Sequence, residues 1–242
     1  MIENIDEEHY MTASTHTGVG SVFLIGATGG VGQHVVRLLR EQEHRVSGLH
    51  RQPSQATAIE ATGAMAVRGD LVDDSAQTLA AAMAGHDAVV FTAGAGGNPD
   101  MVTAIDERGA MKAADAAALA GVRRFVLVSV FMDAWRGEKS PGPGFERYME
   151  AKRAADVHLS GTELDWLIIR PGTLTDDPGT GRVDAGVAIT YGDIPRADVA
   201  AAIAHAVFAP QLNRLAIEIT TGSQPIDAAL SAIRSGPWQP GL

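Results

Sequence analysis

Apolar residues recur along the chain with two alternating periods. Short stretches rich in apolar residues are typical of buried strands, and they lie at 22–25, 45–49, 64–68, 88–92, 125–129, 166–169 and 215–219. Apolar residues at helical spacing fill the intervals, at 31–39, 53–62, 73–83, 99–120, 145–159, 196–208 and 226–233. Strands that alternate with helices predict an α/β fold built on a doubly wound, mostly parallel sheet.

Some finer features follow from the same pattern. The helix over 73–83 is expected to take Asp73 or Asp74 as its cap. The Ala-rich stretch over 99–120 predicts one long helix. The segment 173–192 predicts turns and a short strand pair, and the next helix is expected to begin near Asp193 or Pro195.

Length and composition describe one globular domain. The chain has 242 residues, of which 45% are hydrophobic, enough for a sizeable core. We expect one α/β domain over 19–242, with a small elaboration near its C-terminus. Residues 1–18 are polar and acidic, so we expect a mobile tail rather than a signal peptide, with Met11 as an alternative start.

Charge and residue usage exclude several classes of function. The net charge of −10 and the scattered basic residues argue against a binder of nucleic acid or anionic membranes. The chain has no cysteine, and its histidines lack metal-ligand spacing, so we expect no thiol chemistry and no metal. No apolar run approaches a membrane span. A cytoplasmic location is the resulting expectation, and the protein is expected to be a monomer or a homodimer.

A glycine-rich turn follows the first strand, in the sequence IGATGGVG. Gly26 permits a sharp exit from the strand, Gly29 lets the backbone approach a pyrophosphate, and Gly32 lets the following helix pack closely. The helix N-terminus favours phosphate. The residues expected to hold the diphosphate are Gly26, Thr28, Gly29, Gly30, Val31 and Gly32. The alternative is a tight turn without a ligand, but the strand before and the helix after fit a dinucleotide site.

The end of the second strand indicates which dinucleotide binds. An acidic residue there would hold the ribose 2′-hydroxyl of NAD, but no Asp or Glu lies between Arg45 and Ile59. Arg51 instead suits a 2′-phosphate. The sequence therefore favours NADP over NAD, unless Arg51 is an ordinary solvated arginine.

The remaining polar strand ends are expected in the same cleft, because ligands of such sheets lie beyond the carboxyl ends of the strands. These ends are Asp70, 92–97, Ser129 and 171–173.

Tyr148 and Lys152 lie four residues apart and therefore share one helix face. A tyrosine is a poor proton donor or acceptor at neutral pH until a cation stabilises its anion, which Lys152 would do while also holding a ribose. Ser129 would orient the substrate oxygen. The hypothesis assigns catalysis to Tyr148, Lys152 and Ser129; the alternative is a packed tyrosine and a solvated lysine.

These motifs together carry a resemblance to a known family. They are IGATGGVG, Arg51, Gly69-Asp70-Leu71, Thr92-Ala93-Gly94, Val128-Ser129, Tyr148 with Lys152, and the stretch 164–172. From about Ser21 to Ile233 the chain resembles the atypical short-chain dehydrogenase/reductase superfamily, in the NAD(P)H-binding group that contains NmrA-like and flavin- and biliverdin-reductase-like proteins.

The resemblance implies further roles. Asp70 and Leu71 would flank the adenine, Ala93 and Gly94 would pass beneath the adenine ribose, and Pro171, Gly172 and Thr173 would border the nicotinamide. Thr92 belongs to the same nucleotide-binding set. Asp70 as a helix cap and Pro171-Gly172 as a simple turn are the alternatives. Asp106 matches a position common in this group, with a structural role equally open.

The predicted function is an NADP(H)-dependent oxidoreductase of a small carbonyl, quinone or flavin-like substrate. The chain lacks the asparagine and the longer signature of classical family members. Two alternatives therefore stay open: an NADP(H)-binding redox sensor without turnover, and a nucleotide-sugar-type epimerase or dehydratase.

Overall fold

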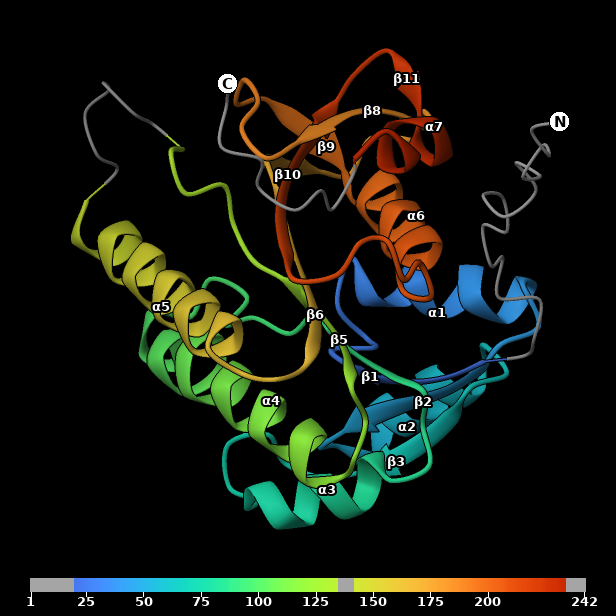
Figure 1. The fold of residues 1–242 in the computed structure, drawn as a ribbon. Helices are drawn as coiled ribbons and strands as arrows, with labels where there is room; N and C mark the ends of the chain where they lie inside the picture. The colour runs from blue at the N-terminus through green and yellow to red at the C-terminus, as the bar shows by residue number, and fades with distance from the viewer. Residues whose placement is uncertain (1–19, 135–141, 234–242) are drawn as a thin grey trace, which may run out of the picture.

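The computed structural model describes residues 20–134 and 142–233 (Figure 1), so the tail expected at 1–18 lies outside the described residues. Its main sheet has nine strands in the order β11-β8-β10-β6-β5-β4-β1-β2-β3. The strands of this sheet are β1 (Ser21–Ile25), β2 (Arg45–His50), β3 (Met65–Arg68), β4 (Ala88–Phe91), β5 (Arg124–Val128), β6 (Asp165–Pro171), β8 (Arg182–Gly186), β10 (Leu215–Thr221) and β11 (Gln224–Pro225). All neighbours from β3 to β10 are parallel, and only β8 and β11 bring antiparallel pairs. The predicted doubly wound, mostly parallel sheet is confirmed.

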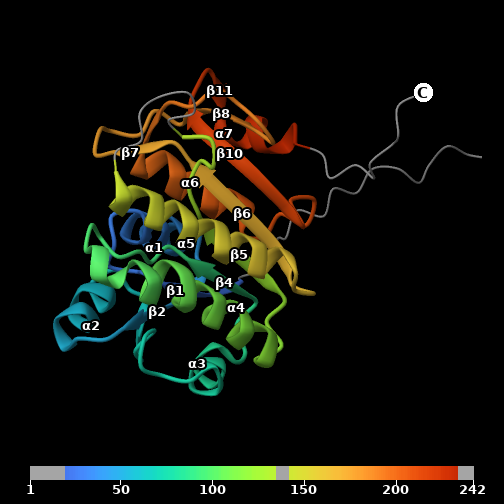
Figure 2. The same ribbon diagram turned by 90° about the vertical axis from the view of Figure 1, so that its left-hand side faces the viewer.

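Helices cover both faces of the sheet (Figures 1 and 2). They are α1 (Gly32–Glu41), α2 (Pro53–Glu60), α3 (Ala76–Met83), α4 (Ala110–Leu119), α5 (Pro143–Ser160), α6 (Arg196–Ala206) and α7 (Ile226–Ser231). Each face has its own apolar core. One core joins the sheet to α1, α6 and α7, and the other joins it to α3, α4 and α5. Burial of both strand faces explains why the strands read as continuous apolar runs.

The chain reverses its direction across the sheet between β1 and β4. Strands β2 and β3 lie on one side of β1, whereas β4, β5 and β6 follow on the other. This switch point opens a crevice at the carboxyl ends of the two central strands. The glycine-rich turn after β1 and Thr92 after β4 both lie there, as the sequence predicts.

The predicted helix over 99–120 is present, but its winding is not regular along its length. A short 3₁₀ turn (Pro99–Met101) and a π-helix (Thr103–Gly109) precede the α-helix α4. A π-helix winds more loosely than an α-helix, and such segments are frequent at functional sites. We call the π-helix Thr103–Gly109 the π-turn.

The predicted cap of the third helix is also wrong. Helix α3 begins at Ala76, and Ser75 caps it by accepting a hydrogen bond from the Thr78 N–H at 3.1 Å. The Asp74 carboxylate turns back instead and accepts from the Asp70 N–H at 2.7 Å. Because the Asp74 carboxylate already bonds Asp70, it does not cap the helix. The next residue, Ser75, takes that role, and the helix begins after it.

The segment after β6 differs in its pairing. The short strand β7 (Thr173–Thr175) pairs in parallel with β9 (Asp193–Pro195), and Pro195 at the end of β9 is also the N-cap of the next helix, as the sequence predicts. Strand β8 joins the main sheet beside β10. Helix α6 then begins at Arg196 and packs against α1.

Candidate functional site

The glycine-rich turn closes tightly against the end of β4. Gly26 has a φ of +93°, and a Cβ atom there would lie 2.5 Å from the Ala93 nitrogen. The Thr92 hydroxyl donates to the Ile25 and Gly26 carbonyls at 3.1 and 3.2 Å. A Cβ at Gly32 would collide with the Gly26 carbonyl oxygen. Both glycines are therefore required for the turn, as predicted.

Helix α1 presents its N-terminus to this turn. It begins at Gly32 behind Val31, and its first turn has no acidic side chain. The helix dipole and the N–H groups of its first turn therefore favour an anion here. The predicted diphosphate-binding residues all lie in one continuous turn, residues 26–32, which we call the glycine cradle.

A cavity of about 170 Å³ lies on the β2 and β3 side of the cradle. The predicted residues that line it are Gly26, Thr28, Arg51, Asp70, Leu71, Ala93 and Gly94. The Arg51 side chain is 57% exposed, and its Nε lies 3.9 Å from Asp70 Oδ2. The Asp70 Oδ1 atom accepts from the Val72 and Asp73 N–H groups at 2.8 and 3.2 Å. Asp70 thus stabilises its own turn while its second oxygen faces Arg51.

A second cavity, of about 590 Å³, lies on the β4 and β5 side; we call it the reaction cavity. It brings together Thr92, Ala93, Gly94, Ser129, Tyr148 and Lys152. Pro171, Gly172 and Thr173 line neither cavity. Gly172 packs against the Gly192 carbonyl, and the Thr173 hydroxyl lies 2.7 Å from the Tyr191 hydroxyl. Leu174 borders the reaction cavity instead.

Lys152 is tied into a buried ion pair. Its Nζ lies 3.0 Å from Asp106 Oδ1, and the two side chains are 5% and 1% exposed. Asp106 Oδ2 also accepts from the Ala95 N–H at 2.9 Å, which fixes the loop after β4. Nζ donates as well to the Val128 carbonyl at 3.3 Å. The π-turn supplies Asp106, so the irregular helix places a carboxylate against the predicted catalytic lysine.

Tyr148 keeps its proton in this surrounding. The Lys152 Nζ lies 5.7 Å from the centre of the tyrosine ring. Burial raises the pKa of Tyr148; Lys152 lowers it, as the sequence predicts, but Asp106 raises it, and the balance is upward. A phenol that is protonated at neutral pH is a proton donor.

Ser129 is buried at the end of β5 and also lines the reaction cavity. Its hydroxyl has no hydrogen bond of good geometry among the described residues, although it is close enough to Asp156 to lower the pKa of that carboxyl. Burial outweighs this effect and raises the pKa of Asp156, which Arg170 Nε contacts at 3.0 Å. The hydroxyl of Ser129 remains available to a substrate oxygen.

Two residues of the site were not assigned a role from the sequence. Asp106 was noted, but its pairing with Lys152 depends on a π-turn for which the sequence carries no signal. Arg196 also lines the reaction cavity, beside the glycine cradle. It follows the cradle by more than half the chain, so no local pattern connects the two.

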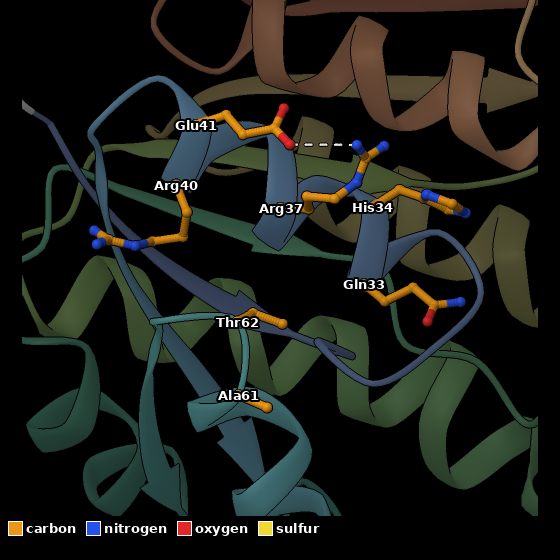
Figure 3. A pocket seen from close by; sticks show the side chains of 7 residues that line it. All are labelled: Gln33, His34, Arg37, Arg40, Glu41, Ala61 and Thr62. Carbon is orange, nitrogen blue, oxygen red and sulfur yellow. Dashed lines mark hydrogen bonds and ion pairs between the residues drawn. The ribbon is translucent and has the colours of Figure 1, made fainter.

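Other surface features lack comparable chemistry. A hollow of about 700 Å³ on the outer side of α1 and α2 is lined by mostly exposed side chains, among them Arg37 and Glu41, which pair at 3.3 Å (Figure 3). His158 bonds Asp115 at 2.7 Å. Within residues 20–134 and 142–233, no group of histidine and acidic side chains is placed to hold a metal. None of the helices in this same part of the chain has the length and apolarity to cross a membrane.

The fold and the glycine cradle together define a dinucleotide-binding protein of the Rossmann type. A family model for NAD(P)H-binding proteins matches residues 26–210, so the chain belongs to this NAD(P)H-binding family. This match confirms the family that the sequence motifs predict.

Three relatives illustrate its range. YhfK of Bacillus subtilis, which carries the name uncharacterized sugar epimerase, is 38% identical over 219 residues, covering 88% of this chain and 99% of YhfK. A Bacillus halodurans structure, provisionally classed as an NAD-dependent epimerase/dehydratase, matches with a TM-score of 0.81 at 30% identity, covering 88% of this chain and 100% of its own. ChuY of Escherichia coli O157:H7, an anaerobillin reductase, matches with a TM-score of 0.71 at 28% identity, covering 84% of this chain and 98% of its own.

Proposed function

We propose that the protein is an NADPH-dependent reductase of a small carbonyl, quinone or flavin-like acceptor. The observation that carries the proposal is the reaction cavity, where Tyr148, the buried Lys152 and the buried Ser129 line one space beside the glycine cradle. The raised pKa of Tyr148 supports reduction as the direction, because the reaction then needs a proton donor.

Each residue of the reaction cavity has its own role in the proposed reduction. NADPH, when bound, supplies the hydride. Ser129 donates a hydrogen bond to the acceptor oxygen and orients it. Tyr148 delivers its proton to that oxygen as negative charge develops there. Lys152 then stabilises the tyrosinate that remains, and Asp106 holds the ammonium group in place. Solvent returns the proton to Tyr148 for the next cycle.

The cavity beside β2 supports NADP as the cofactor. Arg51 lies at the end of β2 with a half-exposed guanidinium, and Thr28 and Gln55 border the same space. Planar guanidinium donors match a phosphate, and Asp70, the carboxylate that lines this cavity, is partly used by its own turn. No acidic side chain lies at the end of β2 itself to accept from a ribose 2′-hydroxyl.

The test is NADPH oxidation across a panel of small carbonyls, quinones and flavins, in wild type and Tyr148→Phe. Loss of the tyrosine proton is expected to reduce kcat about 10²- to 10⁴-fold while NADPH affinity is unchanged. Ser160→Ala is the control, because it removes a hydroxyl from the exposed end of the same helix, where Ser160 bonds the Val157 carbonyl and lines neither cavity. No turnover with any acceptor, or equal turnover in Tyr148→Phe, would contradict the proposal.

A sugar epimerase is the second candidate, and the name of the 38% identical YhfK favours it. The same tyrosine would then act on a sugar hydroxyl, and the cofactor would be reduced and reoxidised within one cycle. An epimerase consumes no NADPH overall, because the hydride taken by the cofactor returns to the other face of the same carbon and inverts the stereocentre. Product analysis by NMR with NADP⁺ present distinguishes the two. A pure redox sensor predicts nucleotide binding with neither outcome.

A further inference from the structure

Arg196 occupies the space above the glycine cradle. It is the first residue of α6, and its Cδ and Nε lie 2.8 and 2.9 Å from where a Cβ atom at Gly30 would stand. The missing side chain of Gly30 is therefore replaced by an arginine from the far end of the sequence. The same side chain lines the reaction cavity together with Val31, the residue that precedes α1.

The guanidinium of Arg196 makes an ion pair, and its partner is exposed to solvent. Its Nη1 pairs with Asp176 Oδ1 at 2.7 Å, but the Asp176 side chain is 90% exposed. Ion pairs with such an exposed partner contribute little, because water competes for both charges. The Arg196 side chain itself is 28% exposed. Most of its N–H donors stay available to a ligand that enters the crevice.

We propose that Arg196 binds the diphosphate bridge of the cofactor at the edge of the glycine cradle, where its side chain lies over Gly30. The cradle offers backbone N–H groups and a helix N-terminus, and Arg196 adds a planar, permanently charged donor that suits phosphate oxygens. The inference rests on the proposed function, since it assumes a nicotinamide dinucleotide in the cradle. An anionic group on the acceptor is the other source of the same chemistry.

Nucleotide titrations distinguish these sources without any turnover. Wild type and Arg196→Gln are titrated with NADPH, with 2′-phospho-ADP-ribose, which keeps the diphosphate but lacks the nicotinamide, and with 2′-AMP, which lacks the diphosphate. Arg196→Gln is expected to bind the first two ligands about 10-fold or more weakly, as for a lost charge-assisted contact, and 2′-AMP equally well. Arg37→Gln is the control, because Arg37 lies on α1 in the outer hollow and pairs with Glu41.

A double-mutant cycle tests the contact itself. Gly30→Ala is expected to weaken NADPH binding by displacing the arginine side chain, and to cost much less in an Arg196→Ala background, because nothing is then displaced. Unfolding in urea checks that each variant is folded.

The outcomes separate this inference from the proposed function. If wild type binds NADPH and Arg196→Gln binds it equally, the inference is overturned, and a raised KM for an anionic acceptor alone would assign Arg196 to the substrate. Equal weakening for 2′-AMP would also overturn it, because the effect would then not depend on the diphosphate. If wild type binds no nucleotide, the proposed function falls and the inference with it.

Discussion

The two halves of the crevice, the glycine cradle and the reaction cavity, differ in whether backbone or side chains form them. The glycine cradle is made of backbone from neighbouring positions, 26–32, and its shape depends on missing side chains. The reaction cavity is made of side chains from separate elements, and a buried ion pair between Asp106 and Lys152 holds it together. The first half is therefore sensitive to added volume, whereas the second is sensitive to a change in charge.

The largest expected effect comes from breaking the ion pair. Lys152→Met leaves the Asp106 carboxylate buried without a counter-charge, and we expect the free energy of unfolding to fall by about 3–5 kcal/mol. Adding Asp106→Asn removes the uncompensated charge while keeping an acceptor for the Ala95 N–H, so much of the loss should return. Urea unfolding measures both. A single variant that costs under about 1 kcal/mol would show that the pair contributes little.

Added volume in the glycine cradle comes next. Gly32→Ala places a Cβ against the Gly26 carbonyl, so the turn must open, at a cost of about 1–3 kcal/mol in stability. NADPH affinity should fall as well, because the backbone groups move. Gly161→Ala is the control, since a Cβ there meets only ordinary contacts beyond 3.4 Å. An unchanged NADPH affinity in Gly32→Ala would show that the shape of this turn does not determine nucleotide binding.

The preference for NADPH over NADH should depend on Arg51 and not on the arginine at the other end of β2. Arg51→Gln removes the charge expected to meet the 2′-phosphate, so NADPH affinity should fall about 10-fold while NADH affinity stays the same. Arg45→Gln, at the opposite end of β2, should change neither. Calorimetric titration with both nucleotides gives the ratio. A protein that prefers NADH before any substitution would refute the choice of NADP.

The smallest expected effect concerns pH. Tyr148 acts as an acid only while protonated, so the reduction rate is full below its pKa and lost above it. Asp106 helps to raise that pKa, so Asp106→Asn should move the alkaline limb of the pH–rate profile to lower pH. Asp115→Asn, which alters a more exposed pair with His158, should leave the limb in place. A shift toward higher pH would reverse the assigned sign.

The contrast between the halves also explains what the sequence predicts. The strand before the cradle, the helix after it and the common face of Tyr148 and Lys152 follow from patterns within a few residues, and the structure places them as expected. The π-turn, the Asp106–Lys152 pair and the position of Arg196 depend on contacts between distant segments. The Ser75 cap of α3 is not predicted, because the Asp74 carboxylate bonds the Asp70 N–H and so does not cap the helix.

The π-turn limits how this chain can change in length. Its looser winding accommodates residues that a regular helix over the same distance would not hold. Deleting a single residue from Thr103–Gly109 would favour regular α-winding, and each residue removed rotates the preceding part of the helix by about 100°. The Asp106 carboxylate would then turn away from the lysine. The number of residues between Ala95 and Asp106, and within the π-turn, is therefore constrained by the contacts that Asp106 makes with the Ala95 N–H and Lys152.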